Sequence, residues 1–382
     1  MVTVECLLNS IISTPGARAT CFDIKDFYLN NPLPTSEYIR FQADMILRDI
    51  WEQYNLEQVH DNGRVYARVD KGMYGLPQAG RVAYNHLVPI LTNAGYREAG
   101  RTPGLFRHDQ NDIAFTLVVD DFLIQHTSEA ALTHLIDTLQ THYTITIDQQ
   151  ATKYCCMHLD WNYVEGHVTL SMPGYVERAL HRFMHPKPPT PQHAPHNWTP
   201  PTYGTKIQYA EDDDESALLD PKTSLGSNKS STRFSFMPEP STIPCWLALG
   251  TLAAAQTKGT QQTMDATVQL LNYAATNQDA AIWFHESDMV LYAHSNASYL
   301  SEPQARSRVG GYFYLGNRHK PADHPTPNGP IHIEKQIHEK HNGSGIRSRN
   351  RSPIPQRTGS STYPSDPHRT RPSPNGTNTD NH

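Results

Sequence analysis

The chain has 382 residues, 37% of them hydrophobic, and a formal net charge of −6. This length allows two or three domains, and the negative charge excludes an overall basic surface, so nucleic-acid contact would need a local groove. The five cysteines are too irregularly spaced for a zinc site or a disulfide framework, which favours a reducing, intracellular compartment. No apolar run reaches the length of a membrane span and the N-terminus lacks a signal-peptide pattern, so we expect no membrane association.

Residues 1–185 are predicted to form one compact α+β unit. Residues 19–30 (ATCFDIKDFYLN) begin as a strand and break into polar turn residues. Residues 71–80 (KGMYGLPQAG) form a loop that glycine and proline punctuate. The apolar residues directly after this loop recur at helical spacing, which predicts a helix that ends at Gly95.

Residues 115–124 (FTLVVDDFLI) are the most informative stretch of the chain. Their apolar and β-branched composition predicts a buried β-hairpin with Asp120 and Asp121 at its tip. Two adjacent carboxylates in an apolar setting repel each other and lose hydration, and a divalent cation is the usual compensation. An ordinary surface turn is the alternative, because Asp is also common in turns.

The remainder of this unit continues the α+β pattern. Residues 128–143 predict an amphipathic helix that Ser128 can cap. Residues 154–163 and 167–172 predict a second hairpin, and residues 174–183 predict a short helix.

The second half of the chain changes character twice. Residues 186–244 are predicted to be a Pro-rich and acidic linker without order, and residues 245–334 return to helices followed by strands. The polar, aperiodic residues 335–382 predict a disordered tail. Within the linker, residues 223–244 are abruptly rich in Ser and Pro. Two local frameshifts, here and in the tail, or a genuine flexible linker and tail would both explain these compositions.

Three motifs follow one another in a specific order: FDIKDFYLN at 22–30, KGMYGLPQAG at 71–80 and LVVDDF at 117–122. Each is weak alone, but together they resemble the reverse transcriptase palm, and specifically the polymerase of copia-type retrotransposons. The resemblance implies a palm with partial fingers and a thumb-like region within residues 1–185. An incomplete ribonuclease H-like α/β domain would follow it within residues 245–334.

The resemblance also implies a catalytic site for RNA-directed DNA synthesis. Asp23, Asp120 and Asp121 would bind two Mg²⁺ ions, with Mn²⁺ as a substitute, that activate a primer 3′-hydroxyl and stabilise the leaving pyrophosphate. The partners would be an RNA template, a DNA primer, a dNTP and the rest of the retrotransposon polyprotein. The protein would act inside the cell, in a cytoplasmic virus-like particle or in the nucleus.

Three further residues would contact the nucleotide according to the resemblance. Tyr28 would lie under the incoming sugar as a steric gate, although a core aromatic is the alternative. Gln78 would contact the nucleotide or the template, although a solvated residue in a Pro-induced turn is the alternative. Asp26 would hydrogen-bond in the nucleotide region, or it would cap a turn.

Residues 294–317 resemble the opening strands of a ribonuclease H domain. Asn296 stands where that fold uses a metal-binding Asp, and a neutral amide is a poor Mg²⁺ ligand, so we predict no ribonuclease H activity.

Two alternatives to an active polymerase remain: a catalytically impaired nucleic-acid-binding remnant, and an unrelated α+β domain with a surface Asp-Asp turn. A large separation between Asp23 and Asp120 would favour the unrelated domain.

Overall fold

The computed structural model describes residues 1–197 and several later segments. Residues 198–215, 220–244, 256–258, 299–306, 320–323 and 339–382 are not described. All the described residues belong to one unit, Met1–Glu339. The compositionally unusual segment 223–244 and the expected tail beyond His338 lie outside the described residues.

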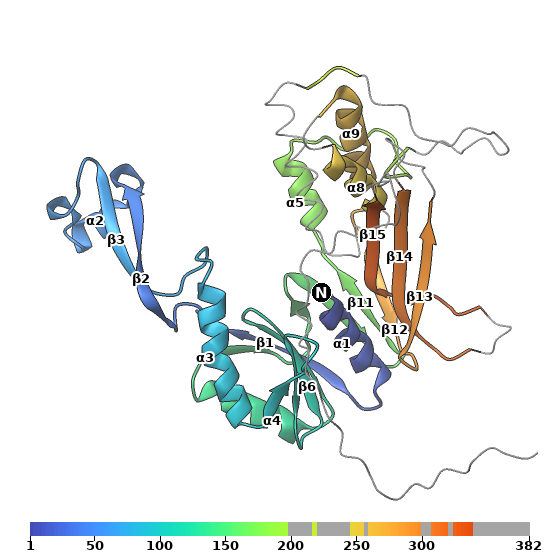
Figure 1. Cartoon of the computed structure of the whole chain (residues 1–382), viewed down its shortest axis with the longest axis horizontal. Helices are drawn as coiled ribbons and strands as arrows, with labels where there is room; N and C mark the ends of the chain where they lie inside the picture. The colour runs from blue at the N-terminus through green and yellow to red at the C-terminus, as the bar shows by residue number, and fades with distance from the viewer. Residues whose placement is uncertain (198–215, 220–244, 256–258, 299–306, 320–323, 339–382) are drawn as a thin grey trace, which may run out of the picture. The chain divides into compact units, whose positions relative to one another are not determined.

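A six-stranded sheet with the order β4-β5-β6-β7-β1-β8 is the largest sheet among the described residues, and its strands β1 and β6 are labelled in Figure 1. Every neighbouring pair of its strands is antiparallel. The predicted α+β class is confirmed, and so are the strand after residue 18 and the hairpin around the Asp-Asp pair. The strands are β1 (Arg18–Ile24), β4 (Tyr96–Glu98), β5 (Leu105–His108), β6 (Ile113–Val118), β7 (Asp121–His126) and β8 (Ile145–Asp148).

Two helices, α3 (Ala79–Asn93) and α4 (Glu129–Gln140), pack on one face of this sheet. Leu87 from α3 and Leu135 from α4 are fully buried in the same cluster as aromatic residues of the sheet. Both helices were predicted from their periodicity. Ser128 lies at the N-cap of α4 as expected, but its side chain makes no capping hydrogen bond, so the predicted role of its hydroxyl is wrong.

The other face of the sheet packs against helix α1 (Val2–Ser13) and a four-stranded sheet with the order β12-β11-β10-β9. Side chains alternate along β7, which explains why both faces of the sheet are buried. Phe122 and Ile124 pack in the cluster that contains α3 and α4, whereas Leu123 packs in the cluster that contains α1 and the four-stranded sheet. The strands of the smaller sheet are β9 (Lys153–Tyr154), β10 (Met157–Asn162), β11 (His167–Ser171) and β12 (Ala281–His285).

Two of the expected domain boundaries, at 185 and 244, are crossed by packed elements. Strand β12 pairs with β11, so a strand that we assigned to the second half belongs to a sheet of the first half. Helix α5 shares a hydrophobic cluster with α8 and α9. These helices are α5 (Tyr175–Arg182), α8 (Trp246–Ala254) and α9 (Gln261–Thr276). The described residues of both halves fall into one unit by their contacts.

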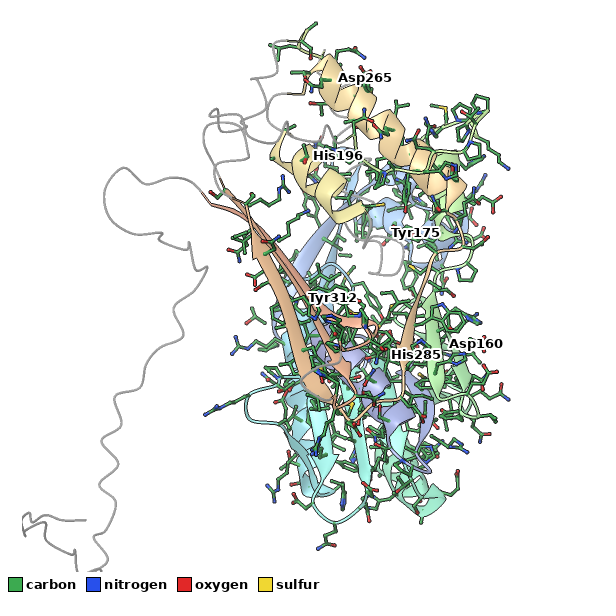
Figure 2. The ribbon with its side chains drawn as sticks, turned by 90° about the vertical axis from the view of Figure 1, so that its right-hand side faces the viewer. Asp160, Tyr175, His196, Asp265, His285 and Tyr312 are labelled. Carbon is green, nitrogen blue, oxygen red and sulfur yellow. The ribbon has the colours of Figure 1, made fainter. Side chains whose placement is uncertain are left out.

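A third antiparallel sheet, with the order β13-β14-β15, follows β12 in the sequence. Its strands are β13 (Val290–Ala297), β14 (Ser307–Gly316) and β15 (Pro330–His338). Strand β15 extends past residue 335, where the tail was expected to begin. The buried Asn328 ties β12 to β14: its Oδ1 accepts from the His285 N–H at 2.8 Å, and its carbonyl accepts from the Tyr312 hydroxyl at 2.7 Å. His285 and Tyr312 are labelled in Figure 2.

A separate two-stranded hairpin lies between β1 and α3 in the sequence. It consists of β2 (Pro32–Gln42) and β3 (Arg64–Lys71), and its connection contains the short elements η1 (Ala43–Met45), α2 (Arg48–Gln53) and η2 (Leu56–Gln58). The loop after β3 leads directly into α3, as predicted for residues 71–80. Within the described ranges, no helix combines the length and apolar character that crossing a membrane requires.

Candidate functional site

Asp23 and Asp121 are direct partners across the β1–β7 pair. Side chains of directly opposed residues project from the same face of a sheet, with Cβ atoms roughly 4.5–5.5 Å apart. The neighbouring pair, Phe22 and Phe122, is buried on the opposite face. Antiparallel register therefore places two carboxylates side by side on the face that carries Cys21.

Asp120 lies in the two-residue turn that joins β6 to β7. Because Val118 pairs with Asp121, the tip of the hairpin consists of Val119 and Asp120, and Asp121 already belongs to the strand. The Asp120 carbonyl accepts a hydrogen bond from the Ile24 N–H at 3.1 Å, which fixes the turn to β1. The three predicted aspartates therefore converge, and the alternative with Asp23 far from Asp120 is not supported.

The backbone of this turn is strained. Val119 has a φ of 62°. A β-branched residue is rare in the left-handed region because its Cβ substituents crowd the backbone. Strain of this kind persists where the surrounding structure enforces it, and such positions cluster at functional sites.

The three carboxylates repel one another, and this repulsion shows in the pKa values of two of them. Partial burial, and then the charge of Asp120, raise the pKa of Asp23. Burial also raises the pKa of Asp121, with the charges of Asp120 and Asp23 acting in the same direction and hydrogen bonds from Cys155 acting against them. In the described part of the chain, no group of three or more His, Cys, Asp or Glu side chains is placed so that it could hold a metal ion. The donor set nevertheless suits a hard divalent cation, which would relieve this repulsion.

Tyr74, from the loop between β3 and α3, reaches the same carboxylates. Its hydroxyl donates a hydrogen bond to Asp120 Oδ2 at 2.8 Å, and this bond, together with burial, raises the pKa of Tyr74 to about 12. Sequence reasoning missed Tyr74. The motif around it marked a loop, but nothing local to the motif signals which carboxylate an aromatic side chain will meet.

Tyr28 is half-buried beside this hydrogen bond. Its ring meets that of Tyr74 edge-on, with 4.6 Å between centroids, and meets Phe27 with 6.0 Å between centroids. Burial and the charge of Asp120 raise its pKa. A Cβ on Gly72 would come within 2.8 Å of the Tyr28 carbonyl oxygen, so glycine permits this close approach of the loop. Tyr28 therefore lies next to the carboxylates and also packs on the core.

Gln78 and Asp26 have other partners in the structure. Gln78 Nε2 donates to Glu37 Oε1 of β2 at 2.8 Å. Asp26 is exposed, with a φ of 54°, and its carbonyl accepts from the Asn30 N–H at 3.1 Å, so its backbone begins a turn. Neither contact involves Asp23, Asp120 or Asp121.

Cys155 and Cys156 form the two-residue turn between β9 and β10. Their φ values are 47° and 64°, and turns of this geometry favour Asn and Gly. Cys155 lies next to Asp121, and burial followed by the charge of Asp121 raises the pKa of its thiol to about 12. The turn thus supports Asp121 from a second sheet.

Asn296 lies elsewhere, on β13 opposite Gly310. Its Oδ1 accepts from the Ala297 N–H at 2.8 Å. A cavity of about 420 Å³ adjoins Asn296. Among the described residues that line this cavity, Glu334 alone carries a carboxylate. In the part of the chain that the structure describes, no cluster of acidic side chains of the kind that a two-metal site needs surrounds this position.

Comparison with known families gives a match over part of the chain. Residues 42–187 match the family described as Reverse transcriptase (RNA-dependent DNA polymerase). The match includes Tyr74, Gln78, Asp120 and Asp121, whereas Asp23 precedes it. The α+β fold and this match together support a reverse transcriptase domain, a class that acts on a nucleic-acid template and primer with dNTPs and normally uses divalent metals.

Proposed function

We propose that the chain is the RNA-directed DNA polymerase segment of a copia-type retrotransposon polyprotein. In this proposal Asp23, Asp120 and Asp121 hold two Mg²⁺ ions, which Mn²⁺ can replace. The single observation that carries the proposal is the direct β1–β7 pairing of Asp23 with Asp121, beside a turn that the Ile24–Asp120 backbone hydrogen bond fixes in place.

The proposed reaction is attack by a primer 3′-hydroxyl on the α-phosphate of a dNTP, with release of pyrophosphate. The bound ions would supply Lewis acidity to the attacking and leaving oxygens. The protein's own part is to keep three carboxylates at one end of β1 and β7. Tyr28, which borders the carboxylates through Tyr74, would lie against the sugar and exclude a 2′-hydroxyl.

Primer extension on an RNA template tests this function directly. Asp120→Asn should abolish extension because an amide replaces a ligand carboxylate. Asp160→Asn is the matched control, since Asp160 is an exposed aspartate on β10 (Figure 2), and this variant should extend the primer like the unchanged protein. Extension that persists in Asp120→Asn would sink the proposal.

A catalytically impaired nucleic-acid-binding remnant is the second candidate. The hydrogen bond between Gln78 and Glu37 favours it, because a Gln that already has a carboxylate partner is not free to meet a nucleotide. The absence of extension, together with salt-dependent binding of an RNA–DNA hybrid, would identify this remnant. In either case we propose that the segment around Asn296 has no ribonuclease H activity and that the protein acts in a virus-like particle or in the nucleus.

A further inference from the structure

The hydrogen bond between Tyr74 and Asp120 links the Gly-rich loop to the proposed metal site. Tyr74 is 61% exposed as a residue, yet its hydroxyl lies 2.8 Å from Asp120 Oδ2. An exposed tyrosine that packs only for its apolar area has no need to place its hydroxyl on a carboxylate. The contact therefore points to an effect of Tyr74 on Asp120.

The loop backbone is anchored so that Tyr74 is held at this position. The Gly72 N–H donates to the Asn31 carbonyl at 2.9 Å, and Gly72 lies against the Tyr28 carbonyl, where a Cβ would approach to 2.8 Å. The Tyr28 ring then meets the Tyr74 ring edge-on, with an interplanar angle of 64°. Backbone and ring contacts thus fix the tyrosine before any ligand arrives.

The chemistry of the contact suits support of a metal ligand. A carboxylate has two oxygens with about four acceptor positions, so a donor on Oδ2 leaves Oδ1 available to a cation. A hydroxyl that donates to a charged oxygen makes a charge-assisted hydrogen bond, which fixes the carboxylate plane more firmly than a neutral bond. Partners of this kind typically change metal affinity or activity by about 10- to 100-fold when they are removed.

We propose that Tyr74 is a positioning residue that orients Asp120 through Oδ2 and leaves Oδ1 for the catalytic cation. This inference rests on the proposed function, since it presupposes that Asp120 binds metal. It gives the KGMYGLPQAG loop a second role besides contact with nucleotide, because the same loop would set the affinity of the site for its ion.

The test uses the full chain and two readouts. Mn²⁺ binding without nucleic acid is followed by electron paramagnetic resonance, and the Mg²⁺ concentration for half-maximal primer extension is measured separately from the dNTP KM. Tyr74→Phe keeps the ring and removes the hydroxyl, so Mn²⁺ affinity should fall about tenfold or more and the Mg²⁺ requirement should rise equally. The dNTP KM should not change.

Tyr66→Phe is the matched control, because Tyr66 lies on the neighbouring β3 with a similar exposure of 56%. This variant should bind Mn²⁺ like the unchanged protein. The proposal would be overturned if Tyr74→Phe bound Mn²⁺ as tightly as the unchanged protein or more tightly. It would also be overturned if the loss of Mn²⁺ binding only matched a loss of folded protein measured by circular dichroism. If Asp120→Asn also leaves Mn²⁺ binding unchanged, the metal site itself fails; if only Tyr74→Phe leaves it unchanged, the role of Tyr74 alone fails.

Discussion

Asp23 and Asp121 stand directly opposite each other on adjacent antiparallel strands, although like charges at such positions destabilise a sheet. No protein gains stability from this arrangement by itself. The divalent cations of the proposed function would offset this repulsion.

The carboxylate repulsion predicts a pH-dependent cost to stability. The pKa values of Asp23 and Asp121 are raised in the folded state, so the folded protein holds these protons more tightly than the unfolded chain does. Their destabilising effect is therefore absent below the ordinary Asp pKa of 3.8 and develops as the pH rises through the raised values. In EDTA at pH 7, Asp121→Asn should be more stable than the unchanged protein by about 0.5 kcal/mol, a modest value because the site is partly solvated.

Thermal unfolding between pH 3.5 and pH 7 measures this difference, which should shrink as the pH falls. Added Mg²⁺ should raise the Tm of the unchanged protein more than that of Asp121→Asn, because ligand binding to the folded state stabilises it. A variant that is less stable than the unchanged protein in EDTA at pH 7 would contradict the prediction.

The strained turn predicts an unusual response to glycine. Val119→Gly keeps the left-handed backbone but removes the steric cost of the side chain there, about 1–2 kcal/mol, against an entropic cost of about 0.5–1 kcal/mol for glycine. We expect a neutral or slightly stabilising effect in urea unfolding. Val118→Gly, at the adjacent end of β6, is the control and should destabilise by about 1 kcal/mol. Equal losses in both variants would mean that the φ of Val119 carries no strain.

The hydrogen bond between Gln78 and Glu37 predicts competition with nucleotide. If Gln78 contacts the incoming dNTP, it must first leave Glu37. Glu37→Ala should then lower the dNTP KM by about 2- to 10-fold, the worth of one such bond, while Gln78→Ala should raise it. Steady-state primer extension measures both values. A raised KM in Glu37→Ala would show instead that the contact supports the nucleotide site.

The position of Tyr28 predicts its effect on sugar selection. Tyr28→Val should increase the use of ribonucleotides relative to deoxyribonucleotides by at least about tenfold, because the smaller side chain leaves space for a 2′-hydroxyl. Tyr28→Phe should preserve discrimination, since the ring against Tyr74 is unchanged. Competitive incorporation of paired nucleotides measures the ratio, and unaltered selection in Tyr28→Val would leave only the core-packing role.

The environment of Asn296 predicts that a single reversion restores nothing. Asn296→Asp would add one carboxylate to a cavity whose described lining otherwise offers Glu334 together with the cations Arg308 and Lys335. Two-metal hydrolysis needs more acidic ligands than this. An RNA–DNA hybrid with labelled RNA should stay intact with Asn296→Asp, and specific cleavage by this variant would refute the expectation.

Local patterns were sufficient for the elements that carry the site. The strand with Asp23, the loop with Gln78, helix α3 and the Asp-Asp hairpin were all predictable, because alternation, helical spacing and turn residues are properties of short segments. The order of three motifs also indicated a reverse transcriptase, although the family match begins at residue 42, after Asp23.

Contacts between distant segments were not predictable in this way. The register that opposes Asp23 to Asp121, the pairing of β12 with β11, and the reach of Tyr74 to Asp120 each join segments that no local pattern relates. Strand pairing depends on which faces the rest of the chain buries, and a hydrogen bond between side chains depends on where two separate backbones are held. The sequence therefore pointed to three aspartates, and the packed sheets determined that Asp23 stands opposite Asp121 and that the Tyr74 hydroxyl reaches Asp120.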